Sequence, residues 1–313
     1  MTSTTTTNPT PNLESLQLSG RRAFTERFAR IAFLGAASTS LIISALIVWS
    51  LAAETWTFVS QVDPAALWTD GWFPRRGQYD VKTLFVGSFL ITGIAIVVAV
   101  PLGLGAAIYL SEYAHPGVRK VLKPVLEILA GIPSVVLGFF ALTFISPEIV
   151  QRFFGDATQF NMMAAGIGVG LLTIPLVASV SEDAMRSVPD SLREASYGLG
   201  ARRITTTIRV VIPAAVSGLV AALIIAVSRA LGETMVVFIA AGATGGALFT
   251  YDVLGPGQTM TAAIASQAAG TDQVVGEGLT FQSLFFVASL LFLFTLALNL
   301  IADRFVRRVR QSY

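Results

Sequence analysis

The sequence contains no cysteine and a single histidine, His115. The absence of thiols excludes disulfide bonds and thiolate metal sites, and one histidine cannot build a histidine-rich cluster, so we expect neither a metal nor a cofactor. Charged residues are also scarce, at 13% of 313 residues, whereas about 25% is typical of soluble domains. No segment has the Gly-x-x-x-x-Gly-Lys-Ser/Thr pattern of a phosphate-binding loop. We therefore expect that the chain does not hydrolyse ATP itself and is not an enzyme.

Long uncharged runs are present instead. A membrane-spanning helix needs roughly 20 apolar residues, and hydrophobic residues make up 54% of the chain. Six segments qualify: residues 31–53, 83–111, 128–147, 157–181, 210–228 with its continuation 234–251, and 278–302. Because only helices and closed barrels satisfy their backbone groups in lipid, the sequence predicts an all-α polytopic membrane protein with six transmembrane helices.

Lysine and arginine alternate between loops as six crossings require. Sixteen of the 21 basic residues precede the first run, follow the last, or lie between runs two and three or runs four and five. Cytoplasmic loops retain such charges, so both termini are expected in the cytoplasm of a bacterial cell, and His115 in an exposed cytoplasmic loop. All four tryptophans lie between residues 49 and 72, as in an aromatic belt at the outer face of the inner membrane.

Composition divides the chain into three parts. Residues 1–28 form a predicted disordered cytoplasmic tail, because the first nineteen are rich in threonine, asparagine, proline and serine. Residues 29–82 hold the first transmembrane helix and an outer loop, and residues 83–313 form the core. The first apolar run has 23 residues, which is too long for the core of a typical secretory signal, so we expect an uncleaved anchor.

One predicted cytoplasmic loop, residues 182–209, is long, polar and charged. Pro189 suits the first turn of a helix. Gly200 permits a sharp break before a second helix, which is expected to begin near Arg202 and to enter the fifth span near Pro213. The sequence therefore predicts a cytoplasmic coupling helix between spans four and five.

Within this loop a spaced pattern reads Glu194-Ala195-Ser196, then Gly200, then Val210-Val211-Ile212-Pro213. The pattern resembles the loop of the permeases of ABC importers, in which the corresponding residues have the same spacing. Where the residues differ from that pattern, the replacements are conservative. The resemblance implies a coupling helix that docks into a groove on a separate ATPase subunit. In that arrangement Glu194 contacts basic groups, Ala195 allows close approach, Gly200 supplies the bend and Pro213 ends the pattern. A loop helix lying on the membrane surface is the alternative.

Two further segments narrow the resemblance. Residues 130–138 contain Ile-Pro-Ser-Val-Val, and residues 229–235 read Arg-Ala-Leu-Gly-Glu-Thr-Met. Over residues 83–304 the chain resembles PstC-type permeases of phosphate importers, which makes residues 83–313 an ABC importer permease core. The resemblance implies import of inorganic phosphate with four kinds of partner: a PstA-type second permease, a PstB-type ATPase dimer, a PstS-type extracytoplasmic binding protein and membrane lipid.

Arg229 and Glu233 form the only oppositely charged pair inside a predicted span, and their i,i+4 spacing places them on one helix face. A charge at mid-membrane costs roughly 2.5–3.5 kcal/mol, so such residues usually face a polar pathway or a partner. A guanidinium suits phosphate oxygens, which makes Arg229 the first candidate for contact with an anion. Glu233 either neutralises and orients Arg229 or accepts a proton from phosphate. A purely architectural ion pair is the alternative.

Pro133 and Ser134 interrupt the third apolar run. Such a break could open backbone amides toward a pathway, so both residues are candidates for its lining. Small residues and proline also serve helix packing in membranes, and that interpretation stays open.

Three other functions compete with phosphate import. A permease of the same architecture for another oxyanion, such as sulfate or phosphonate, differs only in its solute. A secondary transporter should show interrupted helices repeated in two halves, and the sequence shows no such repeat. An intramembrane hydrolase is improbable with one histidine outside the spans and no cysteine.

Overall fold

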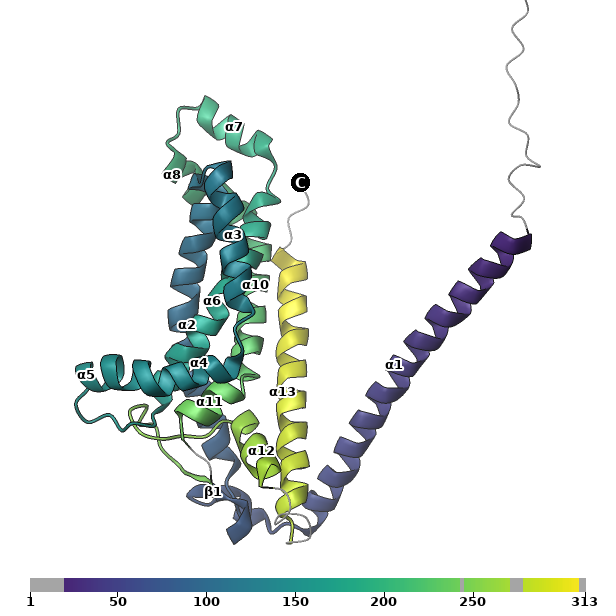
Figure 1. The fold of residues 1–313 in the computed structure, drawn as a ribbon, viewed down its shortest axis with the longest axis vertical. Coiled ribbons are helices and arrows are strands. Elements are labelled where there is room, and N and C mark those ends of the chain that lie inside the picture. Colours follow the sequence, from purple (N-terminus) through teal and green to yellow (C-terminus); the bar gives the residue numbers. More distant parts are fainter. Residues whose placement is uncertain (1–19, 243–244, 271–277, 310–313) are drawn as a thin grey trace, which may run out of the picture. The chain divides into compact units, whose positions relative to one another are not determined.

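The computed structural model describes residues 20–242, 245–270 and 278–309 (Figure 1). Its contacts divide the chain into two units, Met1–Ala53 and Glu54–Tyr313. The helix α1, Gly20–Gln61, forms the described part of the first unit and continues into the second. Residues 20–28 are therefore helical, which corrects the expectation of a tail as far as residue 28. The remainder of that expected tail, residues 1–19, lies outside the described residues.

Helices make up most of the described chain, as the composition predicted. After α1 they are α2 (Val81–Ile108), α3 (Pro116–Ala130), α4 (Ser134–Phe140), α5 (Gln151–Phe153), α6 (Met162–Arg186), α7 (Asp190–Gly198), α8 (Arg203–Thr206), α9 (Ile212–Ala214), α10 (Val216–Leu231), α11 (Met235–Ala240), α12 (Met260–Ala269) and α13 (Thr280–Val309). Stretches of π-helix cover η4 (Tyr109–Tyr113), η5 (Ala141–Val150) and η6 (Thr207–Val211), and short 3₁₀ turns cover η2 (Pro64–Trp68) and η3 (Pro74–Arg76).

The core of the second unit is a bundle in which α2 packs along α6, with α10 and α13 beside them (Figure 1). Glycines make the contact between α2 and α6 close. A Cβ atom on Gly166 would lie 2.7 Å from the Cβ of Ile94, and one on Gly103 would lie 2.7 Å from the Cβ of Val177. Close approach through small residues is how membrane helices associate, because lipid offers no hydrophobic drive between them.

The third predicted span is broken. Helix α3 ends at Ala130, and α4 begins only at Ser134, so the single helix expected over residues 128–147 is wrong in its bounds. Pro133 has no N–H to donate and disfavours helical geometry in the residue before it, which accounts for the break at the predicted place. From Ser134 the helical path continues through η5 and α5 to Phe153, and in Figure 1 it runs across the direction of α2 and α6.

The fifth predicted span is also broken, and it is shorter than expected. The segments Arg203–Ala214 and Val216–Leu231 meet at an angle of 73°. Helix α10 ends at Leu231 and α11 at Ala240, so the described residues 241–242 and 245–251 are not part of a span, contrary to the prediction. Glycine explains the early end, because Gly242 and Gly246 adopt positive φ angles of 72° and 131°, which other residues rarely adopt.

Five helices of the described chain are long and apolar enough to cross a membrane, and the bent pair brings the number to six. The fourth and sixth spans lie later than expected, at Met162–Arg186 and Thr280–Arg304. A small antiparallel sheet was not expected in an all-α protein. Its strands β2 (Gln78–Tyr79), β1 (Gly71–Phe73) and β3 (Ala247–Leu248) lie in that order and are only two or three residues long.

Candidate functional site

The candidate site in the bundle is built around the break between α10 and α11. The Nη1 atom of Arg229 lies 2.9 Å from Oε2 of Glu233, so the predicted ion pair forms, although α10 ends between the two residues. The Glu233 side chain is 3% exposed and that of Arg229 is 47% exposed. The buried carboxylate therefore holds one edge of a guanidinium whose other edge remains accessible.

Glu233 is fixed by two further elements of the fold. Its Oε1 atom accepts a hydrogen bond of 3.4 Å from the backbone N–H of Val236 at the start of α11. The hydroxyl of Thr261, in α12, donates to the carbonyl oxygen of Glu233 at 2.8 Å. Thr261 was not a candidate in the sequence, because nothing there relates residues 28 positions apart. These contacts fix the position from which the Glu233 carboxylate contacts Arg229.

The segment that contains Pro133 and Ser134 lies close to this break. Pro133 precedes α4, Ser134 begins it, and α4 packs on α11. A Cβ atom on Gly138 would lie 3.1 Å from the Met235 carbonyl oxygen and 3.1 Å from Val236 Cα. The structure thus brings the two segments together through Gly138. No hydrogen bond or ion pair in the described part of the chain joins Pro133 or Ser134 to Arg229 or Glu233.

The predicted coupling loop forms a separate feature at one end of the bundle (Figure 1). Helix α7 contains Glu194 and Ala195, both exposed, and ends before Gly200, whose φ of 75° requires the predicted break. Pro213 lies exposed in α9, next to the bend into α10. The exposed face of α7 is thus free to contact another protein.

Arg193 anchors α7 to the bundle, a role that its place among the loop charges did not indicate. Its Nη2 atom lies 3.0 Å from Oε1 of Glu112, which belongs to η4 and is 3% exposed. The same guanidinium donates to the carbonyl oxygens of Met185 at 2.8 Å and Val188 at 2.6 Å. Because Glu112 and Arg193 are 81 positions apart, no local pattern could have identified this pair.

A second ion cluster joins α3 to α6. Glu182, whose side chain is fully buried, lies 2.5 Å from a nitrogen of Arg119 and 3.2 Å from Nζ of Lys123. Lys123 also donates to Asp183 at 2.9 Å. That hydrogen bond, helped by Glu182 and partly opposed by desolvation, raises the pKa of Lys123 above its usual value, so the ammonium stays charged at neutral pH.

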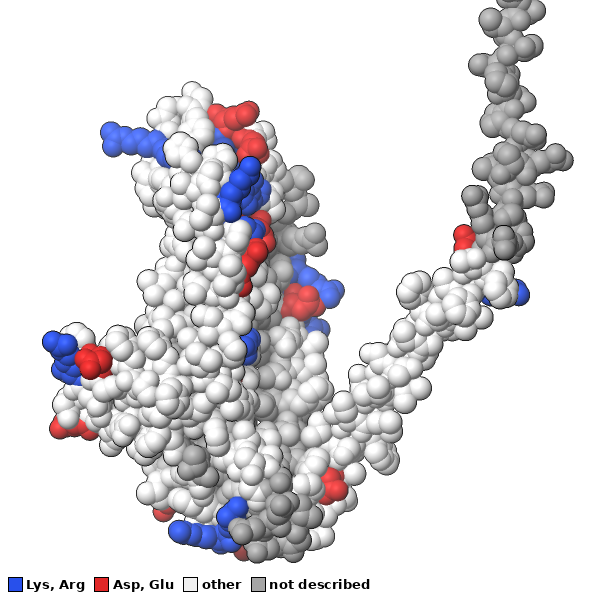
Figure 2. Space-filling view, viewed as in Figure 1, with Lys and Arg blue, Asp and Glu red and all other residues white. Residues whose placement is uncertain are grey.

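The surface is consistent with a lipid environment. On the face shown in Figure 2, most of the surface of the second unit is uncharged, and the charged side chains form a few separate groups. Among the described residues, no group of three or more histidine, cysteine, aspartate and glutamate side chains could hold a metal ion.

The described chain combines apolar helices, with breaks in the third and fifth predicted spans, and an exposed helical loop at one end of the bundle. This arrangement defines the class of the protein, a membrane permease subunit. The chain belongs to the family of inner membrane components of binding-protein-dependent transport systems, whose model matches residues 99–311. It is a transport subunit of the inner membrane, and the family of the ABC importer permeases inferred from the motifs is confirmed.

Several curated proteins are similar to the chain. It is 40% identical over 189 residues to the probable ABC transporter permease protein YqgH of Bacillus subtilis, a match that covers 59% of this chain and 61% of that protein. It is 30% identical over 308 residues to the phosphate transport system permease protein PstC of Mesorhizobium japonicum, covering 92% of each. It is also 31% identical over 225 residues to PstA 1 of Mycobacterium tuberculosis, covering 71% of this chain and 70% of that one.

Solved structures of ABC transporters share the fold. A chain of a bacterial importer of the acidic polysaccharide alginate superposes with a TM-score of 0.61 at 16% identity, covering 92% of this chain and all of that one. A chain of the MetNI methionine transporter, in an inward-facing conformation, gives a TM-score of 0.53 at 21% identity, covering 74% of this chain and 94% of that one.

Proposed function

We propose that this chain is the permease subunit through which an ATP-driven importer moves inorganic phosphate across the inner membrane. The names of similar proteins, PstC and PstA among them, support phosphate as the solute. The observation that carries the proposal is the half-exposed guanidinium of Arg229, set in an otherwise uncharged helix and held on one side by a buried carboxylate.

Arg229 is suited to bind an oxyanion transiently. Only its Nη1 atom makes a hydrogen bond within the described part of the chain, so the remaining N–H groups of the guanidinium are available. A planar guanidinium donates two parallel hydrogen bonds to phosphate oxygens and keeps its charge at physiological pH. The neighbouring carboxylate offsets part of that charge, which weakens the hold on the anion and so favours its release.

Glu233 has two possible roles in the proposed pathway. It orients Arg229, or it also accepts a proton from a protonated phosphate, which sulfate could not supply near neutral pH. A Glu233→Gln variant separates these roles, because full selectivity for phosphate over sulfate would exclude the proton role. Pro133 and Ser134 remain pathway candidates because α4, which follows them, packs against α11.

The partners proposed are those of a complete importer. Glu194 and Ala195 would contact one subunit of a PstB-type ATPase dimer. Gly200 would supply the bend that lets α7 move, and Pro213 would transmit that movement into α10. A PstA-type permease would form the second half of the channel, and a PstS-type binding protein would deliver phosphate from outside. This arrangement requires both termini and α7 on the cytoplasmic side, as the positive charges predict.

The test is uptake of radiolabelled phosphate into vesicles that contain the whole complex. ATP-dependent uptake that unlabelled phosphate suppresses and sulfate does not would support the proposal. A complex with an inactive ATPase serves as the control for leakage. Uptake of sulfate in preference to phosphate would retain the importer class and overturn the solute.

A further inference from the structure

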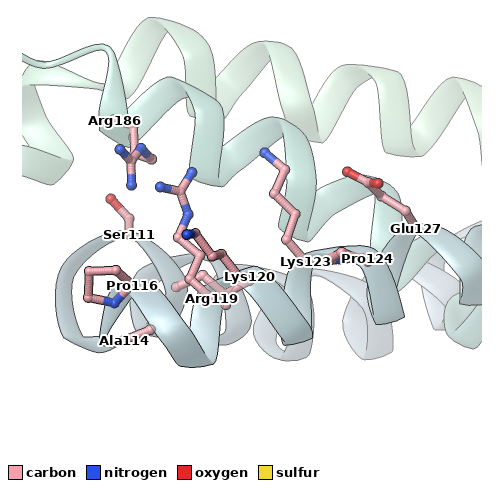
Figure 3. A pocket seen from close by; sticks show the side chains of 10 residues that line it. Ser111, Ala114, Pro116, Arg119, Lys120, Lys123, Pro124, Glu127 and Arg186 are labelled. Atoms are coloured by element: carbon pink, nitrogen blue, oxygen red, sulfur yellow. The ribbon is translucent and has the colours of Figure 1, made fainter.

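A basic pocket of about 470 Å³ lies between α3, η4 and the last turn of α6. Its lining includes Ser111, Ala114, Arg119, Lys120, Lys123 and Arg186. Figure 3 shows Arg186 facing Ser111 and Arg119 across one end of this pocket, with Lys123 and Glu127 further along α3. Four of the ten lining residues are cationic and one is acidic, so the wall is built mainly from positive charge and apolar groups.

The charges of the pocket are only partly compensated. Arg119 and Lys123 pair with Glu182 and Asp183 behind the wall. Lys120 and Arg186 are exposed and form no ion pair in the described part of the chain. They extend from different helices, so an anion between them would be held from both sides.

A buried hydrogen-bond donor also favours an anion in this pocket. The Nε atom of Arg119 is buried and has no hydrogen-bond partner among the described residues, although buried donors are nearly always satisfied. An oxyanion in the pocket would supply acceptors close to that guanidinium. The Ser111 hydroxyl, which donates to Glu112 at 2.9 Å, lies on the same wall.

We propose that this pocket binds a phosphate group at the end of the bundle that carries α7. Arginine and lysine together suit a phosphate group, and the apolar walls from Leu110, Pro116 and Pro124 can accept an organic substituent. The source is free inorganic phosphate or the headgroup of an anionic lipid. The phosphate site is inferred from the geometry of the pocket and does not depend on the proposed function. Only its occupation by free inorganic phosphate rests on that function.

The pocket is also joined to the coupling loop. An adjacent cavity of about 300 Å³ shares Ser111 and Arg186 with it and is lined by Asp190, Arg193 and Tyr197 of α7. Arg186 lies four residues before the first residue of α7. A phosphate group held by Arg186 would therefore lie next to Arg193, the anchor of that helix.

The lack of native cysteine provides a direct test. An Ala114→Cys variant places a single thiol in the pocket of this chain, within the complete complex in phosphatidylcholine nanodiscs. Its modification by uncharged N-ethylmaleimide is followed as a mass shift of the chain. One arm adds millimolar inorganic phosphate against chloride at equal ionic strength, and the other replaces part of the phosphatidylcholine with phosphatidylglycerol.

Protection of the thiol in the first arm identifies free phosphate, and protection in the second arm alone identifies a lipid headgroup. We expect Lys120→Gln/Arg186→Gln to weaken the protection about tenfold, the combined size of two charge contacts at an exposed site. Arg202→Gln/Arg209→Gln, which removes two exposed charges outside the pocket, should leave protection unchanged.

Two results overturn the proposal: a reactive thiol that neither anion protects, or equal protection in the Lys120→Gln/Arg186→Gln variant. Phosphate uptake by the same preparation is measured in parallel. Normal uptake without protection refutes the pocket and leaves the proposed function intact, whereas protection without uptake refutes the function alone.

Discussion

Replacing Arg193 by glutamine should release α7 from the bundle. The variant leaves Glu112, 3% exposed, without its cation and removes the donors to the Met185 and Val188 carbonyls. Removing one partner of a buried ion pair costs about 3–5 kcal/mol. No residue of α7 is itself buried, so the cost should appear as local opening of α7 rather than as unfolding of the bundle.

That energy corresponds to a rise of roughly a hundred- to several-thousand-fold in the population with α7 detached, since about 1.4 kcal/mol is a factor of ten. Hydrogen–deuterium exchange of residues 190–198 in the purified complex measures it. We expect fast exchange of these residues in the variant. The complex should still hydrolyse ATP but take up little phosphate. Glu112→Gln/Arg193→Gln should recover part of the protection, because no buried charge is left unpaired.

The matched control is Asp190→Asn, which removes the exposed contact of Asp190 with Arg193 at 3.3 Å. An exposed pair contributes at most about 1 kcal/mol, so exchange should change little. Unchanged exchange and uptake in Arg193→Gln would refute the anchoring role.

Three further predictions concern packing, backbone and charge. Gly138→Val should abolish uptake and lower stability by about 1–3 kcal/mol through overpacking against the α11 backbone, measured by thermal unfolding and transport. Gly200→Ala should lower the stability of α7 by about 1–2 kcal/mol because Gly200 has a positive φ. Gly198→Ala, in a helix with open space around it, should be neutral. Equal effects of the two variants on the hydrogen–deuterium exchange of α7 would contradict this prediction. Glu182→Gln should destabilise the contact between α3 and α6 far more than Asp183→Asn, and equal melting temperatures would contradict the burial argument.

The sequence was sufficient where a property is local. Apolar runs located the long helices of the bundle, and the helix expected between Pro189 and Gly200 is α7. The i,i+4 spacing of Arg229 and Glu233 predicted their ion pair, although Glu233 lies just beyond the end of α10 rather than on its face.

Hydropathy failed where helices end inside apolar sequence. Residues 241–251 are uncharged, so their hydropathy did not signal that α11 stops at Ala240, although their glycines could have. The short sheet was invisible for a similar reason, since strands of two or three residues leave no periodicity.

Long-range pairs were beyond sequence reasoning altogether. Glu112 with Arg193, and Glu182 with Arg119, join residues far apart in the chain, and each charge alone is typical of a loop or helix end. Only the fold shows that these carboxylates are buried and that their partners hold α7 and α3 in place.

The most direct test of phosphate import through this chain is the uptake of phosphate by complexes that carry Arg229→Gln. The variant must assemble normally and retain its ATPase activity, and Arg307→Gln, an exposed arginine paired with an aspartate at i,i+4, is the matched control. We predict that Arg229→Gln transports essentially no phosphate and that the control transports like the wild type. Wild-type uptake by Arg229→Gln would contradict the account, because the ion pair of Arg229 with Glu233 would then be architectural.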